Sequence, residues 1–377
     1  MKQTSIKFGN QDLASMRTAL SLARRGLGNV WPNPAVGCIL VRNDLNNRIV
    51  GRGWTQAGGR PHGEIEAINR AQKLAEGSVA YITLEPCNHH GETPPCSESL
   101  INAGIKRCVI AIKDPDPRVL GSGINRLREA GIDIELGVCE KDAKEINAGF
   151  FLRIQKGRPL FTLKTATTID GRIATSRGKS KWITGKKARA FAHKLRANHD
   201  AIMIGIRTAL IDNPLLSCRL PGLEELSPIR IVADTNLRLP NDCALVKTAA
   251  TIPTWVITKS IVDLDRCSQL EDLGVNIIKI DIDKTGHLDL DELVTELGNK
   301  GLTRVLVEGG GALAAAMIKK NLIDELAWFR SAKIIGGDGL GAIAPFGINE
   351  ISKAPTFFCD SIARIGDDIF ETYRRIS

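Results

Sequence analysis

The 377-residue sequence predicts two successive α/β domains, covering residues 1–155 and 156–377. Three observations support this prediction. The length suits two domains, because a single domain usually spans about 100–200 residues. Short apolar runs alternate with helical segments through both halves, which is the pattern of α/β folds. Gly157 and Pro159 interrupt this alternation near the middle of the chain, where they indicate a domain boundary.

The first domain is predicted to be an α/β/α sandwich. Apolar runs typical of buried strands occupy 35–41, 80–84, 107–112 and 133–138. Helices are expected between them at 11–26, 64–76, 96–103 and 121–130. In the second of these helices, Ile65, Ile68 and Ala71 recur at helical spacing. A charged helix at 140–151 leads to the boundary.

The second domain repeats the α/β pattern. Strands are expected at 160–164, 201–205, 229–233, 254–258, 275–280 and 303–308. The last of these strands runs into three consecutive glycines, and an apolar helix is expected at 312–321.

The composition is typical of a globular protein, with 43% hydrophobic and 25% charged residues. No apolar run is long enough to cross a bilayer, so no membrane partner is expected. The first residues lack the apolar core of a secretion signal, and we therefore expect a cytoplasmic protein. Nine cysteines in such a chain indicate reduced side chains and not a disulfide framework.

The net charge of +9 does not indicate a nucleic-acid partner. Lys and Arg residues are dispersed among acidic ones, and aromatic residues make up only 5% of the chain. Nucleic-acid binding usually needs a basic patch with stacking aromatics. Small phosphorylated ligands account better for dispersed positive charge.

The strongest motif combines His62 and Glu64 with Cys87 and Cys96. One imidazole and two thiolates can hold zinc and leave a fourth position for water, whose pKa the metal lowers. Glu64, two residues after the His, would carry the proton to departing ammonia. Zinc deaminases of bases show this pattern of H-x-E followed by P-C. A surface His and two packing cysteines are the alternative, but they leave Glu64 and Pro86 unexplained.

Eight residues separate Cys87 from Cys96, where nucleic-acid deaminases usually have two. Such a loop would cover a small ligand better than a nucleic-acid strand. With the motifs at 31–37 and 113–117, the first 150 residues closely resemble the pyrimidine deaminase of riboflavin biosynthesis. This resemblance implies a cytidine-deaminase-like fold, a phosphorylated pyrimidine substrate and a substrate contact from Asn33.

The glycine run at 309–311 fits either of two interpretations when taken alone. Backbone N–H groups before a helix can meet a phosphate closely, but a tight turn can also simply start a helix. A Rossmann fold is rejected, because its glycine fingerprint opens the domain and this run lies near the end.

Other motifs in the second half favour a cofactor site. Residues 162–174, 180–185, 195–197, 205–219 and 307–310 resemble the riboflavin-pathway reductase, which has a dihydrofolate-reductase-like fold and uses NADPH. Deaminase followed by reductase is the domain order of the bacterial bifunctional enzyme, and the resemblance covers roughly residues 10 to 375. It implies NADPH contacts from Ala166, Trp182, Thr208, Asp212, Thr235, Gly310, Gly311, Ala312, Leu313, Ala314, Ala315 and Ala316.

The same resemblance implies substrate contacts from Ser180, Arg196, Leu216, Arg219 and Glu308. Arg196 and Arg219 suit a phosphate chemically. Lys164 is the candidate for polarising the reacting sugar.

Two positions depart from the family pattern in the deaminase half. Thr55 stands where the family often has a His that contacts substrate, and Glu92 stands where it usually has Lys or Arg. Contacts with the substrate are therefore expected to differ at these positions.

The sequence thus predicts a bifunctional enzyme of riboflavin biosynthesis with zinc and NADPH as cofactors. Its reactions would be hydrolytic deamination of a diaminopyrimidine phosphate, then reduction of the ribosyl group to ribityl. A homo-oligomer formed through the second domain is expected. Two alternatives are an RNA-modifying deaminase with an added binding module, and a second domain that serves only as a dimer platform. The long cysteine loop and the glycine turn argue against the first, and NADPH binding would exclude the second.

Overall fold

The computed structural model describes residues 8–89 and 94–376. The chain divides into two compact units, Met1–Gly157 (unit 1) and Arg158–Ser377 (unit 2). The boundary expected between residues 155 and 156 falls in the last turn of helix α6 (Ala148–Lys156). No helix of the described segments is long and apolar enough to cross a membrane.

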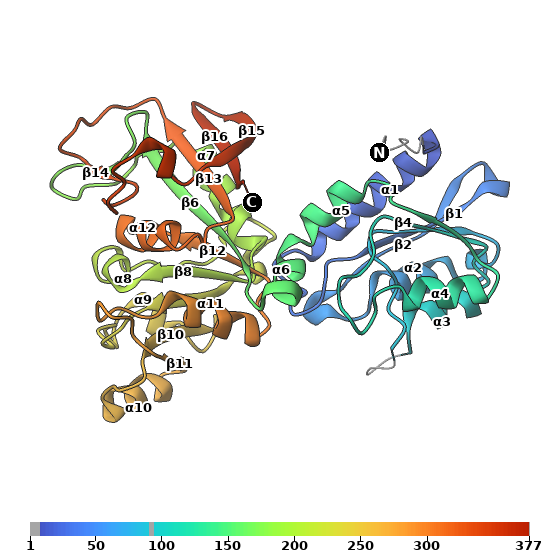
Figure 1. Ribbon diagram of the computed structural model, residues 1–377, viewed down its shortest axis with the longest axis horizontal. Helices are drawn as coiled ribbons and strands as arrows, with labels where there is room; N and C mark the ends of the chain where they lie inside the picture. The colour runs from blue at the N-terminus through green and yellow to red at the C-terminus, as the bar shows by residue number, and fades with distance from the viewer. Residues whose placement is uncertain (1–7, 90–93, 377) are drawn as a thin grey trace. The chain divides into compact units, whose positions relative to one another are not determined.

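Unit 1 is built on a five-stranded sheet in its described part, with strand order β2-β1-β3-β4-β5 (Figure 1). Strand β1 pairs antiparallel with β2 and β3, while β3, β4 and β5 run parallel. The strands are β1 (Gly37–Arg42), β2 (Arg48–Trp54), β3 (Val79–Ile82), β4 (Arg107–Ile110) and β5 (Asp133–Leu136).

Helices cover both faces of this sheet, as predicted for a sandwich. Figure 1 shows α1 (Asn10–Ala23) and α5 (Glu140–Ile146) on one face. Alternate strand residues such as Ile39 and Tyr81 bury against them. The opposite face, with Leu40 and Ile82, packs on the other helices, which are α2 (Gly63–Ala71), α3 (Cys96–Asn102), α4 (Ser122–Glu129) and α6.

Strand β2 was not predicted, and its glycines explain why. Gly51 and Gly53 weaken a strand pattern in the sequence. In the structure they let helix α2 lie directly on the strand. A Cβ atom at Gly53 would lie 2.0 Å from the carbonyl oxygen of Gly63, and one at Gly51 would lie 2.3 Å from that of Ala67.

The helix expected at 140–151 is two helices, α5 and α6, which meet at Asn147. Asn147 has φ −97° and ψ 15°, which is outside regular helical geometry. Its side chain is buried and hydrogen bonds to the backbone of Ala35. A tertiary contact far away in sequence thus accompanies the break.

Unit 2 contains a nine-stranded sheet among its described residues, in the order β11-β10-β9-β8-β12-β6-β13-β16-β15. The first seven strands run parallel, and the last two are antiparallel to their neighbours. The parallel strands are β11 (Val275–Ile280), β10 (Thr254–Lys259), β9 (Ile229–Ala233), β8 (Ala201–Gly205), β12 (Arg304–Glu308), β6 (Leu160–Thr168) and β13 (Glu325–Ser331).

Helices lie on both faces of the second sheet. Ile202, Val232 and Leu306 bury in one cluster with side chains of α8 (Ile206–Asp212), α9 (Ala244–Lys247) and α10 (Leu264–Asp272). Figure 1 shows α11 (Leu290–Asn299) and α12 (Gly311–Lys319) in front of the sheet. Helix α7 (Lys186–Ala197) packs near the antiparallel end through Ala188 and Ala192.

All six strands expected in unit 2 are present, and β6 continues to Thr168. Strand β13 and the terminal strands β15 (Phe357–Ile365) and β16 (Asp368–Arg375) were not predicted from the sequence. Strand β15 is largely exposed, so its sequence has no continuous apolar run. A small sheet pairs β7 (Arg172–Ala174) with β14 (Leu340–Gly341).

Candidate active sites

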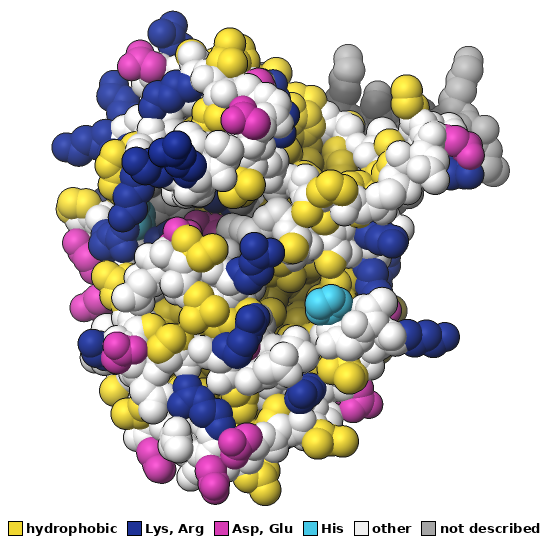
Figure 2. Space-filling model, turned by 90° about the vertical axis from the view of Figure 1, so that its left-hand side faces the viewer, with side chains coloured by type: hydrophobic (Ala, Val, Ile, Leu, Met, Phe, Trp, Pro, Cys, Tyr) yellow, Lys and Arg dark blue, Asp and Glu magenta, His cyan; other side chains and the backbone are white. Residues whose placement is uncertain are grey.

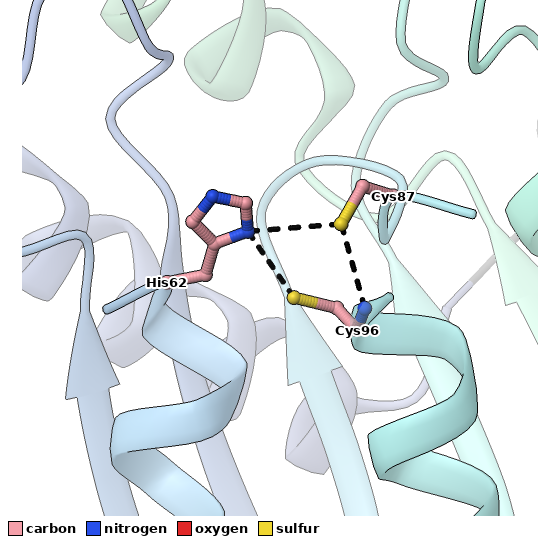
Figure 3. A group of neighbouring side chains, drawn as sticks. All are labelled: His62, Cys87 and Cys96. Carbon is pink, nitrogen blue, oxygen red and sulfur yellow. Dashed lines mark hydrogen bonds between the residues drawn. The ribbon is translucent and has the colours of Figure 1, made fainter. Parts of the chain in front are cut away.

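Three donor side chains meet at one end of the sheet of unit 1. His62 is the residue before helix α2, Cys96 begins helix α3, and Cys87 lies in the loop after β3. Figure 3 shows the imidazole and both thiols pointing toward one another. Helix starts leave backbone N–H groups without helical partners and favour anionic ligands such as thiolates.

The donor atoms are close enough to share one metal ion. His62 Nδ1 lies 3.2 Å from Cys96 Sγ and 3.7 Å from Cys87 Sγ. All three ligand atoms lie within 4.8 Å of one another. The neighbouring Cys96 thiol, and after it His62, lowers the pKa of Cys87 to about 4. One imidazole and two thiols are donors that zinc prefers, so this set fits zinc.

Glu64 lies in the first turn of α2 and is only 3% exposed. Burial is the main cause that raises the pKa of its carboxyl group. Its Oε2 atom has no hydrogen-bond partner among the described residues. A buried oxygen of this kind needs a partner. It is therefore suited to a water molecule or a substrate group beside the three donors.

Glu85 supports the cysteine loop, and sequence reasoning missed it. Its buried carboxylate accepts hydrogen bonds from the backbone N–H groups of Asp114, Gly121 and Ile124, at 3.3, 3.1 and 3.2 Å. Helix α4 thereby starts beside Pro86, whose oxygen would lie 2.0 Å from a Cβ atom at Gly123. The position of Glu85, directly before Pro86 and Cys87, was the available signal.

Of the two departures from the family pattern, Thr55 lies within the described residues and Glu92 does not. Thr55 is buried, and its hydroxyl accepts a hydrogen bond from Val36 N at 3.0 Å and donates to Pro34 O at 3.1 Å. It therefore supports the backbone at Pro34 and Val36. Glu92 lies outside the described residues. Asn33 is partly exposed beside Gly59.

In unit 2 the predicted polar residues meet near the carboxyl ends of parallel strands. Glu308 ends β12, and Lys164 is its register partner on β6. Arg196, in the last turn of α7, donates from Nε and Nη2 to the two Glu308 carboxylate oxygens, at 2.9 Å each. Lys164 Nζ lies 3.6 Å from Glu308 Oε2.

These charges keep Glu308 ionised although it is only 8% exposed. Burial alone would raise the pKa of Glu308, but Arg196 and Lys164 together hold it below its usual range. Arg196 also donates from Nη1 to the carbonyl oxygen of Ser217 at 3.0 Å. The geometry thus favours Arg196 as a support for Glu308 and the Ser217 loop.

The glycine run after β12 has the backbone geometry that only glycine adopts easily. Gly309 and Gly310 have φ values of 81° and 71°. Thr208, near the start of α8, lies against both residues, and a Cβ atom at Gly309 would lie 2.9 Å from Thr208 Cγ2. Gly310, Gly311, Ala312 and Leu313 then form the start of α12. The backbone N–H groups of this turn can approach a phosphate group closely, as the binding of a dinucleotide cofactor requires.

The remaining predicted cofactor residues are placed unequally. Thr208 follows β8, which lies beside β12 in the sheet, and Thr235 follows β9, the next strand beyond β8. Ala166 lies on β6, the other neighbour of β12. Asp212 ends α8 and is exposed, as are Trp182 and Ala316. The side chains of Ala314 and Ala315 are buried in α12, so a ligand would not meet them directly.

The predicted substrate residues also differ in exposure. Ser180 and Arg219 are exposed, whereas Leu216 is buried in the core with φ 54°. Any contact from Leu216 would therefore use its backbone. Figure 2 shows the side of the molecule that lies on the left in Figure 1. This side has a hollow with Lys and Arg side chains beside it and acidic side chains within it.

Comparison with known proteins decides the family. A model of the cytidine and deoxycytidylate deaminase zinc-binding region matches residues 9–112, and a model of the RibD C-terminal domain matches residues 159–370. The chain belongs to the RibD family.

Relatives of known function agree over nearly the whole length. The riboflavin biosynthesis protein RibD of Actinobacillus pleuropneumoniae is 40% identical over 367 residues, covering 97% of this chain and 96% of the relative. The RibD protein of Escherichia coli is 37% identical over 370 residues, covering 95% of this chain and 98% of the relative.

Solved structures agree as well. Acinetobacter baumannii RibD matches with a TM-score of 0.86 and 33% identity, covering 97% of this chain and 99% of that one. The Thermotoga maritima deaminase/reductase matches with a TM-score of 0.84 and 31% identity, at the same coverage.

These findings confirm the predicted α/β fold class and the two activities. The chain is a bifunctional deaminase and reductase of riboflavin biosynthesis, with zinc in the deaminase and NADPH in the reductase. The individual residue roles stay predictions.

Replacing one thiol tests the metal assignment. Cys87→Ala should reduce bound zinc from about one ion per chain to a small fraction, because two remaining ligands hold the metal weakly. Elemental analysis of the purified protein measures this. Cys359→Ala, at an exposed position on β15, is the control and should keep its zinc. Full zinc content in Cys87→Ala would show that Cys87 is not a ligand.

Proposed function

We propose that unit 1 deaminates a diaminohydroxyphosphoribosylaminopyrimidine and that unit 2 reduces the product, a 5-amino-6-(5-phosphoribosylamino)uracil. These are the substrates in the name of the similar Thermotoga maritima enzyme. The observation that carries the proposal is the buried Glu64 carboxyl, unpartnered at Oε2, beside the three donors His62, Cys87 and Cys96.

The deamination is a hydrolysis that exchanges an amino group for oxygen. Zinc held by His62, Cys87 and Cys96 would supply a lowered pKa for the attacking water. Glu64 would take a proton from this water and give it to the departing amino group, which leaves as ammonia. Asn33 would hold the pyrimidine ring through its side-chain amide.

The reduction would occur at the carboxyl ends of the parallel strands in unit 2. Ligands of open α/β sheets usually bind at this edge. When bound, NADPH would supply a hydride to C1 of the ribosyl group in its ring-opened imine form, and water would supply the proton to the imine nitrogen. Lys164 would polarise the reacting sugar, and Glu308 fixes the Lys164 ammonium group.

The two ligands would divide the remaining residues between them. The glycine turn with Thr208, Ala166, Trp182, Asp212 and Thr235 would contact NADPH. Arg219 would bind the substrate phosphate, because it is exposed and carries no ion pair within residues 8–89 and 94–376. Ser180, Leu216 and Glu308 would complete the substrate site, with Arg196 supporting Glu308.

We also propose that copies of the chain associate through unit 2. Strand β15 ends the nine-stranded sheet, and Phe358 and Ile362 on it are exposed. An edge strand with exposed apolar residues is a ready partner for another strand. Light scattering should give a mass that is a multiple of 40.9 kDa, and Ile362→Lys should lower it. A monomeric parent protein would refute this proposal.

We also propose a cytoplasmic location, because the cysteines are reduced. All nine lie among the described residues without a disulfide bond, and most of them are buried. A reducing environment maintains such side chains.

Replacing the proposed proton carrier should separate the two activities. Glu64→Gln should keep its zinc but lose about 10²–10⁴-fold in the rate of deamination, because the amide cannot carry the proton. Reduction of supplied deaminated substrate should continue at the parent rate. Ammonia release and NADPH absorbance measure the two reactions.

Glu66→Gln is the matched control for this variant. Glu66 lies on the same helix but forms a 2.7 Å ion pair with Arg70. The Glu66→Gln variant should deaminate at the parent rate. Parent-level deamination by Glu64→Gln would refute its role, and loss of both activities would indicate a shared site.

A branched residue in the glycine turn should weaken the cofactor. In Gly310→Val the left-handed φ of 71° becomes strained, and the new Cβ atom would lie 3.2 Å from Thr208 Oγ1. The dissociation constant of NADPH, measured by fluorescence, should rise at least about tenfold, or ~1.4 kcal/mol. Zinc content and deamination should not change.

Arg219→Ala provides the comparison, because it should weaken the phosphorylated substrate and leave NADPH binding unchanged. The opposite result for the two variants would show that the two ligands were assigned to the wrong residues. Unchanged constants in both would mean that the glycine run is only a turn.

A further inference from the structure

The segment at residues 33–37, which leads into β1, is fixed by buried side chains from three other parts of unit 1. Asn147, between α5 and α6, is 2% exposed. Its Oδ1 accepts from Ala35 N at 2.8 Å, and its Nδ2 donates to Ala35 O at 3.0 Å. One side-chain amide thus pairs with both backbone groups of one residue.

Two threonines hold the neighbouring backbone groups. The Thr55 hydroxyl accepts from Val36 N at 3.0 Å and donates to Pro34 O at 3.1 Å. The Thr83 hydroxyl accepts from Gly37 N at 2.9 Å. Both threonines are buried. Because buried hydrogen bonds are costly to break, the backbone beside Asn33 has little freedom.

The Asn33 side chain packs against Gly59, which has no side chain of its own. A Cβ atom at Gly59 would lie 1.8 Å from Asn33 Nδ2 and 2.6 Å from Asn33 Cγ. The amide of Asn33 therefore rests directly on the backbone of Gly59. Across residues 8–89 and 94–376, no hydrogen bond of this amide is found, so its donor and acceptor are available to a ligand.

The loop that carries Gly59 ends at the metal ligand His62. Gln56 N donates to Pro61 O at 3.0 Å, which closes the loop, and Gly58 N donates to Asn29 O at 2.9 Å. In addition, a Cβ atom at Gly63 would lie 2.8 Å from Val36 O. The Asn33 segment and the start of α2 are therefore held against each other on both sides of His62.

We propose that Gly59 and Asn147 are positioning residues of the deaminase, which fix the Asn33 amide where it binds the pyrimidine. This inference rests on the proposed role of Asn33 as a substrate contact. A pyrimidine ring offers a carbonyl oxygen and ring nitrogens, which match the donor and acceptor of one side-chain amide. A fixed amide binds the ring in one orientation, and orientation controls how the amino group meets the attacking water.

The adjacent glycines Gly58 and Gly59 provide a matched test. Both have positive φ, 72° and 87°, so an alanine at either position carries backbone strain. A Cβ atom at Gly58 meets open space, whereas one at Gly59 meets Asn33. Gly59→Ala should raise the KM for deamination about tenfold or more, while Gly58→Ala stays near the parent. Zinc content and the reductase activity should be unchanged in both.

A double-mutant cycle shows whether Gly59 acts through Asn33. In an Asn33→Ala background, Gly59→Ala should raise KM no further than Gly58→Ala does, because the displaced amide is already gone. Full additivity of Asn33→Ala and Gly59→Ala would overturn the inference. Asn147→Asp, which loses the donor to Ala35 O, is a second variant and should show the same dependence on Asn33.

The outcomes distinguish the inference from the proposed function. If Asn33→Ala deaminates with the parent KM, the proposed role of Asn33 is refuted, and this inference fails with it. If Asn33→Ala is impaired but Gly59→Ala and Asn147→Asp match the parent, only the positioning role is refuted.

Discussion

The close approach of helix α2 to strand β2 places the proposed metal ligand His62 and the proposed proton carrier Glu64 of unit 1. Gly51 and Gly53 lack side chains, so the helix backbone at Gly63 and Ala67 lies directly on the strand. His62 stands immediately before this helix, and Glu64 is in its first turn. A side chain at Gly51 or Gly53 would push helix α2 away from the strand and move the imidazole of His62 away from Cys87 and Cys96. The position of His62 relative to Cys87 and Cys96 therefore depends on the packing of helix α2 against strand β2.

Unit 2 builds its site by a different physical rule. Parallel strands end at one edge of the sheet, which brings Glu308, the glycine turn and Thr208 together. The buried Glu308 carboxylate remains ionised because Arg196 and Lys164 surround it. Removing either cation would leave the buried carboxylate only partly compensated, which is destabilising. The deaminase thus depends on close backbone packing, and the reductase depends on charge balance at the strand ends.

Sequence reasoning succeeded where the chemistry or the apolar pattern is local. The motif that contains His62, Cys87 and Cys96 predicted the donor set, and the expected strand at 229–233 has the observed bounds. It failed where long-range contacts decide the structure. Strand β2 was missed because its glycines, which weaken the strand pattern, are there to let helix α2 pack against the strand. The break at Asn147 depends on Ala35, which is far away in sequence. The pairing of Arg196 with Glu308 and the burial of Leu216 also depend on tertiary structure alone.

One chain is thus expected to carry out two reactions in a fixed order at two separate sites. Incubation with the diaminopyrimidine phosphate, with and without NADPH, tests this most directly when ammonia and NADPH are followed together. A fixed order of two separate reactions predicts ammonia release at the same rate without NADPH, and NADPH oxidation that begins only as deaminated product accumulates. Ammonia release that requires NADPH, or NADPH oxidation that precedes ammonia, would contradict it.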